Sequence, residues 1–455
     1  MHKLIDNIIP VIAGRRTLVL LPLLISLLFS FLPLSAQISR PSSLAPRSSS
    51  NDSVLRSKAS LITCWPGSEV YELCGHSALR IQAEGTDSVW NYGVFDFAEP
   101  NFVYRFVKGE TDYMLAGYPF SWFMPDYVKH GRTVVEQDLN LSDAQVRQLR
   151  HLLQKEALPQ NRLYRYNYIR DNCATRILDR VRETVGDSII FRSAPAHDSF
   201  RDAMRDFHRN YPWYQFGIDI ALGQGLDGEM TVAEETFAPT EMYRILQQST
   251  FTDGRPVVSA ERVLYQGDES AAVLPPTPWY LTPLAAAVVV LLFSLGACIW
   301  SYRTRRLPRW WYSLFFGLEG VAGCIVAFLV FVSEHEATSP NLLIYWLNPL
   351  QLVLAACVWS QRTRPAAIAM AWINILAVGL LLVCWPFQVQ SANPAFFPLM
   401  AADLILAITY AIIAPSKSYK NNEPPRNLSH MRTRGGQRRS SRRPDAPKAR
   451  GRNRR

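Results

Sequence analysis

The residues best suited to chemistry are a cysteine and the asparagine before it, in the sequence YNYIRDNCATRILDRV (residues 166–181). Asn172 is a favourable N-cap, and apolar residues recur at helical spacing after Cys173, which predicts a helix that begins at Cys173. The free amides and the dipole of a helix N-terminus stabilise a thiolate, and they could also hold the oxyanion formed when it attacks a carbonyl. Cys173 is therefore a candidate nucleophile. The alternative is a small residue packed at a helix end.

A nucleophilic thiol needs a base, and His76 is the candidate. It follows Gly75 in the sequence CGHSALRI and opens an apolar run typical of a strand, which would fix the direction of its ring. His151 lies within a predicted amphipathic helix and His208 lies among charged residues, so we expect both to face solvent, and His130 lies in a loop-like sequence. The alternative for His76 is a structural role at the end of a sheet.

The base would need a partner that orients its ring, and the strand after His76 offers two. The sequence SALRIQAEGTDSVWNYGVFDF predicts a hairpin. A three-residue loop, GTD, would place Asp96 opposite His76, whereas a two- or four-residue loop would place Phe95 there. Because a slip of one residue turns a side chain to the other face, Asn91 is a second candidate beside Asp96.

The elements that position these residues are both strands and helices. The sequence LSDAQVRQLRHLLQKEAL predicts a helix in which Ser142 and Gln145 have capping-box spacing. Its apolar stripe consists of Val146, Leu149, Leu152 and Leu153. Because strands and helices occur in separate runs, we expect an α+β domain.

The chain of 455 residues divides into segments of different composition. Residues 1–37 are typical of a secretory signal peptide, with cleavage near Ala36 or Gln37, although an uncleaved anchor helix is the alternative. Five apolar segments follow the globular part, at about 279–300, 311–332, 341–360, 367–386 and 396–415, each close to the roughly 20 residues that cross a bilayer. The predicted domains are a signal peptide (1–37), a Ser/Pro-rich linker (38–57), a globular domain (58–245), a juxtamembrane connector (246–278), an all-α bundle of five transmembrane helices (279–415) and a basic tail (416–455).

Charge predicts the orientation in the membrane. The loops SYRTRRLPRW and QRTRP are rich in arginine, and they alternate with loops that contain neither lysine nor arginine. By the positive-inside rule, the globular domain is extracytoplasmic and the tail, with fourteen Lys or Arg against two acids, is cytoplasmic. We therefore expect a multi-pass inner-membrane protein whose tail fixes topology and which has no nucleic-acid partner.

The remaining cysteines leave one question open. Cys64 and Cys74, ten residues apart in an oxidising compartment, could form a disulfide or be unpaired core thiols. The other four lie in apolar segments and would act as small apolar residues. The sequence contains no phosphate-binding glycine motif and no Cys/His cluster with zinc spacing, so we expect neither a cofactor nor a metal.

Four motifs carry a resemblance to a known family: PGSEVYELCGHSALRI, NYGVFDFAEPNF, YNYIRDNCATRILD and YPWYQFGIDIALG. In this order they resemble the extracytoplasmic domain of the Lnb-type lipoprotein N-acyltransferases, over roughly residues 60–245. The order of histidine strand, polar strand and cysteine helix also resembles a circularly permuted papain-like (NlpC/P60-type) fold, as in lecithin:retinol acyltransferase. One departure is Cys74, where an aromatic residue such as Phe is expected.

The resemblance implies Cys173 as the nucleophile and His76 as the base. The implied reaction moves a fatty acyl chain from a phospholipid, through a thioester on the cysteine, to the amine of a diacylglyceryl-cysteine lipoprotein. Two alternatives remain at this point. One is a Cys-dependent cell-wall amidase or peptidase, since related folds cleave amides with the same pair. The other is a non-catalytic assembly or transport partner in which the membrane helices carry the function.

Overall fold

The computed structural model describes residues 57–95, 100–268 and 274–416. The signal peptide, nearly all of the Ser/Pro-rich linker, most of the basic tail and Asp96 lie outside the described residues.

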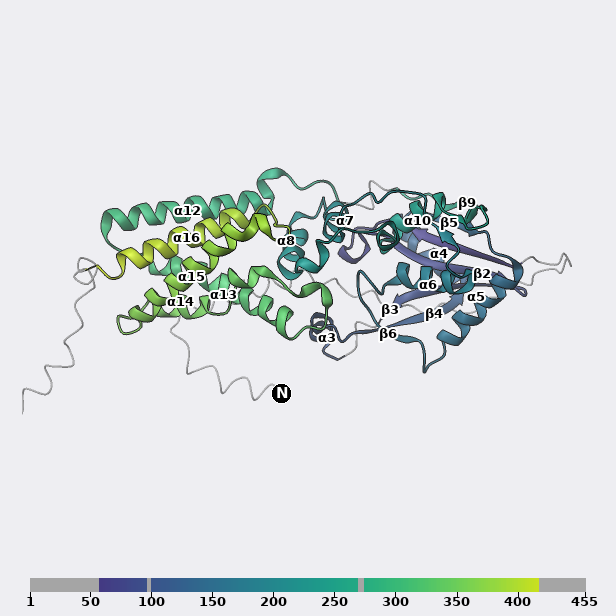
Figure 1. The fold of residues 1–455 in the computed structure, drawn as a ribbon, viewed down its shortest axis with the longest axis horizontal. Coiled ribbons are helices and arrows are strands. Elements are labelled where there is room, and N and C mark those ends of the chain that lie inside the picture. Colours follow the sequence, from purple (N-terminus) through teal and green to yellow (C-terminus); the bar gives the residue numbers. More distant parts are fainter. Residues whose placement is uncertain (1–56, 96–99, 269–273, 417–455) are drawn as a thin grey trace, which may run out of the picture. The chain divides into compact units, whose positions relative to one another are not determined.

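A mixed layer of strands and helices precedes the membrane helices, as the predicted α+β class requires. Its sheet has seven antiparallel strands in the order β6-β4-β3-β2-β1-β5-β9 (Figure 1). The strands are β1 (Lys58–Cys64), β2 (His76–Ala83), β3 (Thr86–Val94), β4 (Asp112–Pro119), β5 (Val134–Leu139), β6 (Leu163–Arg165) and β9 (Val258–Tyr265); β7 (Ile189–Ile190) and β8 (Thr250–Phe251) form a separate pair.

The predicted hairpin is present as β2 and β3, but its register differs from the prediction. The turn consists of Glu84 and Gly85, with φ of 53° and 73°, which is the backbone of a two-residue hairpin turn. Leu79 therefore pairs with Trp90. Continued toward the start of β2, this register places Gly93, rather than Phe95 or Asp96, across from His76, so the predicted register is wrong.

Helices cover both faces of the sheet because successive strand residues point to opposite sides. Leu61 and Leu79 face a core shared with α5 (Asp143–Glu156), α6 (Cys173–Val185) and α10 (Pro239–Gln248). Their neighbours Ile62 and Ala78 face a smaller core with Phe123 of α4 (Phe120–Lys129). The result is a three-layer arrangement in which α6 lies against β2 and β3 (Figure 1).

Both predicted helices are confirmed. The α5 helix begins after Ser142, whose hydroxyl accepts from the Gln145 amide at 3.3 Å in the predicted capping box. Val146, Leu149 and Leu153 are buried, while Leu152 is only half-buried.

The segment predicted as a connector, 246–278, contains one strand of the sheet. It contributes β9, which pairs with β5 from Val134 to Leu139. This pairing joins segments more than a hundred residues apart, which local patterns do not reveal. The further helices of this part are α3 (Phe102–Lys108), α7 (Phe200–Phe207), α8 (Pro212–Ala221) and α9 (Val232–Glu235).

Four helices of the described chain are long and apolar enough to cross a membrane, not the five predicted. They are α12 (Pro283–Thr304), α13 (Arg309–Phe331), α15 (Arg364–Cys384) and α16 (Phe396–Ile413). The third predicted span is divided into a 3-10 turn (Leu342–Tyr345) and the seven-residue α14 (Gln351–Cys357).

The division of that span has a local cause. Pro349 cannot donate a backbone hydrogen bond, and the Asn348 side chain accepts from the Leu350 amide at 3.1 Å in place of a helical partner. The non-helical backbone also packs closely on α13, since a Cβ added at Gly323 would lie 2.4 Å from the carbonyl carbon of Asn348.

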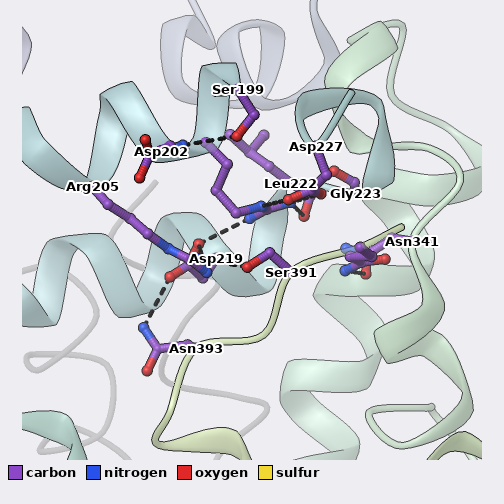
Figure 2. A network of polar contacts seen from close by, with 12 residues as sticks. Ser199, Asp202, Arg205, Asp219, Leu222, Gly223, Asp227, Asn341, Ser391 and Asn393 are labelled. Carbon is purple, nitrogen blue, oxygen red and sulfur yellow. Dashed lines mark hydrogen bonds and ion pairs between the residues drawn. The ribbon is translucent and has the colours of Figure 1, made fainter. Parts of the chain in front are cut away.

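Hydrogen bonds connect α7 and α8 to the loops that join the membrane helices (Figure 2). Asp219, buried on α8, accepts from Arg201 at 2.9 Å and from the Asn393 amide at 2.9 Å. Arg205 donates to the Ser391 hydroxyl at 2.7 Å. We call this group, together with Asp227, the Arg201 cluster.

Candidate active site

Cys173 is the first residue of α6, held there by the predicted N-cap. The Asn172 side-chain oxygen accepts from the amides of Ala174 at 2.8 Å and Thr175 at 3.1 Å. In return, the Thr175 hydroxyl accepts from the Asn172 amide at 2.8 Å, which completes a capping box. The predicted helix start and its cap are confirmed.

The same asparagine also fixes the helix start to two other segments. Its side-chain amide group donates to the carbonyl oxygens of Tyr168 at 2.7 Å and Phe237 at 2.9 Å. Asn172 is buried and uses both ends of its amide. The position of Cys173 is therefore set by the chain before it, by its own helix and by a distant loop.

The Cys173 thiol is buried but has backbone donors around it. Burial raises the pKa of the thiol, and hydrogen bonds from the backbone amides of Ser77, Ala174 and Cys173 itself act in the opposite direction. Space on one side comes from Gly93, whose φ of +88° suits glycine; a Cβ there would lie 4.0 Å from the Cys173 Cβ. The thiol is thus protonated at rest, with donors in place for a negative charge.

His76 opens β2 and is held by Asn91 of β3. Its Nε2 lies 2.5 Å from the Asn91 side-chain oxygen. The Asn91 amide nitrogen donates to the Tyr118 hydroxyl at 3.1 Å, an orientation that presents the amide oxygen to the ring. Nε2 then carries the proton, and Nδ1 keeps the lone pair that accepts one.

The environment keeps this histidine neutral. Burial lowers the pKa of His76 to about 4, and the hydrogen bond with Asn91 opposes this shift only in part. At neutral pH the ring is therefore an imidazole able to take a proton.

The structure places the predicted nucleophile near the start of the strand that carries the predicted base. The Ser77 amide, one residue after His76, is among the donors to the Cys173 sulfur, and α6 packs on β2. Asp96 lies outside the described residues, whereas the second candidate, Asn91, contacts the histidine directly. Tyr118, on β4, had no signal in the sequence because its contact with Asn91 depends on the pairing of β3 with β4.

The other two cysteines of this part are not joined in a disulfide. Cys64 is a buried neighbour of His76 across β1 and β2, and burial raises its pKa to about 12. Burial likewise raises the pKa of Cys74 to about 11, and the Tyr168 hydroxyl lies 3.5 Å from its sulfur. Both are unpaired thiols packed in apolar surroundings.

Of the other histidines discussed above, two are exposed and one is buried. His130 and His151 are exposed, in keeping with their sequences. The prediction for His208 is wrong: it is buried at the end of α7, and its Nδ1 lies 2.7 Å from the Gln215 side-chain oxygen. Among the described residues, no group of three His, Cys, Asp or Glu side chains gathers as metal ligands.

A cavity of about 740 Å³ lies between α12 and α13, but it is lined by membrane-segment residues that include Trp300 and Trp310, not by the Cys173–His76 pair. A smaller one, of about 160 Å³, lies behind the first turns of α6 beside Thr175. Neither cavity contains the site, so its assignment depends on the packing of α6 on β2 and on the hydrogen bond between His76 and Asn91.

Comparison with known proteins gives two family matches. Residues 49–205 match the Lnb N-terminal periplasmic domain and residues 276–418 match the Lnb transmembrane domain, which together cover about two-thirds of the chain. No curated protein and no solved structure matches it. With its apolar helices, the chain is a multi-pass membrane protein with a periplasmic N-terminal domain. It belongs to the Lnb family, of the membrane lipoprotein N-acyltransferase type.

Proposed function

We propose that this protein transfers a fatty acyl chain from a membrane phospholipid to the N-terminal amine of a diacylated lipoprotein. Cys173 is the nucleophile, His76 the general base and Asn91 the residue that orients it. The observation that carries the proposal is a thiol with backbone donors at the start of α6, a helix that packs on β2, whose first residue is a neutral histidine held at one ring nitrogen by Asn91.

The first half-reaction forms a thioester. The thiol proton passes to Nδ1 of His76, and the sulfur attacks the ester carbonyl of the phospholipid. The backbone amides of Cys173 and Ser77, which are not used by the Asn172 cap, would stabilise the oxyanion. When the carbon–oxygen bond breaks, the lysophospholipid alkoxide takes the proton from His76, and the acyl chain stays on Cys173.

The second half-reaction forms the amide. The lipoprotein amine attacks the thioester, His76 accepts a proton from the nitrogen, and the Cys173 sulfur leaves as a thiolate that regains a proton from the histidine. The overall conversion of an ester to an amide is downhill, so no nucleotide is required.

The membrane bundle serves both substrates, because each is anchored in lipid. A catalytic domain tied to transmembrane helices meets lipid-anchored substrates at a high effective concentration. The arginine-rich loops support an inner-membrane location with a cytoplasmic tail, after a signal peptide cleaved near Ala36 or Gln37. The order of His76, Asn91 and Cys173 on β2, β3 and α6 supports a permuted papain-like arrangement.

The test uses cells that lack the native enzyme and a reporter lipoprotein whose acyl chains are counted by mass spectrometry. Wild-type protein should add the third chain, and Cys173→Ala should abolish the addition. Cys74→Ala, a matched removal of a nearby unpaired thiol, should retain it. A third chain added at the normal level by Cys173→Ala would refute the nucleophile.

A Cys-dependent amidase and a non-catalytic partner predict other results. Release of cell-wall peptides that depends on Cys173, with no third acyl chain, would favour the amidase. Acylation that is unaffected by Cys173→Ala but lost when the membrane segments are altered would favour the partner role.

A further inference from the structure

Two acidic side chains lie buried inside the membrane bundle. Glu319 of α13 is 7% exposed and Asp403 of α16 is 0% exposed. Glu319 Oε1 accepts from the Trp346 indole at 2.8 Å, and Asp403 Oδ1 accepts from the Asn374 amide. Among the described residues, Glu319 Oε2 and Asp403 Oδ2 have no hydrogen-bond partner. The two carboxyl groups are also close enough to interact electrostatically.

The polar neighbours of this pair act only as hydrogen-bond donors, and there are fewer donors than carboxyl oxygens. The Asn374 oxygen accepts from the Gln351 amide at 2.6 Å, which leaves the Asn374 amide group to donate to Asp403. One indole and one amide therefore serve four carboxyl oxygens. A proton on either carboxyl would supply the missing donor.

In the described part of the chain, no basic residue forms an ion pair with Glu319 or Asp403 that would neutralise the pair. The helices α12 to α16 contain three basic residues, Arg303, Arg309 and Arg364, and each lies at a helix end. Arg309 and Arg364 precede Glu319 and Asn374 by ten residues, or about 15 Å along their helices. The tyrosines of these helices closest in sequence, Tyr312 and Tyr410, are each about two turns away. Two ionised carboxylates would thus repel each other in a bilayer without a counter-ion.

The broken third span lies at the same place. Trp346, which donates to Glu319, belongs to the non-helical stretch between the 3-10 turn and α14, and Gln351 is the first residue of α14. Irregular backbone at membrane depth is tolerated where it is buried in protein, and discontinuous helices commonly form binding sites there. The interruption of the third span and the carboxyl pair therefore lie at the same place in the bundle.

We propose that Glu319 and Asp403 form an intramembrane proton-binding site that holds one proton, carried by either of the two carboxyl groups. This site is separate from the acyl-transfer centre and does not depend on the function proposed for it. Loss of the proton would place two negative charges in the bundle, so the packing of α13 on α16 depends on its presence.

Infrared spectroscopy of the full-length protein in phospholipid nanodiscs tests the proposal. Wild-type protein at neutral pH should show a carboxylic-acid C=O band that shifts when Glu and Asp carry ¹³C side chains, a readout that requires no variant. Absence of an isotope-sensitive band would overturn the proposal, since both groups would then be ionised. Loss of the band when sodium replaces potassium would also overturn it, because the ligand would be a sodium ion.

Variants test whether the proton is shared. In Glu319→Gln and in Asp403→Asn, the new amide supplies the donor, so the remaining carboxyl should ionise and the band should be lost in each. A full band in either variant would show that one carboxyl holds its proton alone, which refutes the sharing. Glu261→Gln, which removes an exposed carboxylate of β9, is the matched control and should leave the band unchanged.

Discussion

The Arg201 cluster and the active site both bury polar side chains, but they differ in how completely their atoms are paired. Every nitrogen of the Arg201 guanidinium donates to Asp219, Asp227 or the carbonyl oxygens of Leu222 and Gly223 (Figure 2). At the active site, His76 uses one ring nitrogen on Asn91 and keeps the other for a proton. A cluster in which every polar atom is hydrogen-bonded holds parts of the chain together. A cluster with a free acceptor, such as the second ring nitrogen of His76, can exchange protons.

The largest effect should come from removing His76, whose free ring nitrogen accepts a proton. His76→Ala takes away the base, so we expect kcat/KM for acyl transfer to fall by about 10²–10⁴-fold with little change in Tm. The measurement is a transfer assay with purified protein, a phospholipid donor and a lipopeptide acceptor. His130→Ala, the loss of an exposed histidine, should leave the rate unchanged. A decrease of less than tenfold for His76→Ala would contradict its role as the base.

Breaking the Arg201 cluster should instead affect stability. Arg201→Met leaves Asp227 buried without its cation and Asp219 with Arg205 alone, so we expect a loss of about 3–5 kcal/mol in the free energy of unfolding. Thermal unfolding of the full-length protein in detergent should show this as a clear fall in Tm. The matched variant Arg209→Met alters a largely exposed arginine and should change the free energy of unfolding by less than about 0.5 kcal/mol. Equal effects of the two would refute the contrast.

A smaller effect on kcat/KM should follow from removing Asn91, which orients the His76 ring. Asn91→Ala removes the acceptor of Nε2–H, so the ring loses its fixed orientation and tautomer, and we expect about a tenfold fall in kcat/KM. Tyr118→Phe should cost less, since that hydroxyl acts through Asn91. If Asp96→Ala costs more than Asn91→Ala, the orienting residue is Asp96 instead.

The smallest expected effect concerns the pH dependence of kcat/KM and of Tm. Because burial lowers the pKa of His76 to about 4, the acid limb of kcat/KM should lie near pH 4 rather than near the ordinary value of 6.5. Between these values the unfolded chain binds a proton that the folded chain does not, so stability should fall as pH decreases from about 6.5 to 4. His76→Gln should reduce this slope of Tm against pH. An acid limb near 6.5 would show that the ring is solvated.

Sequence could predict the elements whose signals are local. The N-cap at Asn172, the start of α6 at Cys173 and the capping box of α5 depend on residues within one turn of each other. The hairpin turn was misplaced because Glu84, which is not a typical turn residue, adopts a positive φ. Its apolar alternation fits several registers, so the choice between Asn91 and Asp96 remained open.

Features that depend on distant contacts were not predictable in the same way. The pairing of β9 with β5 and the contact of Tyr118 with Asn91 join strands far apart in the chain. Hydropathy found the third membrane segment but could not detect its interruption at Asn348 and Pro349, because one polar residue and one proline hardly change an average. The free state of Cys64 and Cys74 likewise follows from packing rather than from spacing.

The four hydrogen bonds of the Asn172 side chain explain why an amide, rather than a carboxylate, precedes the nucleophile. Aspartate would accept from the helix amides equally well, but it could not donate to the carbonyl oxygens of Tyr168 and Phe237. It would also place a second anion beside the thiolate. Serine would cap the helix without reaching both carbonyls. Of the common N-capping residues, asparagine alone anchors this turn on both sides while remaining uncharged.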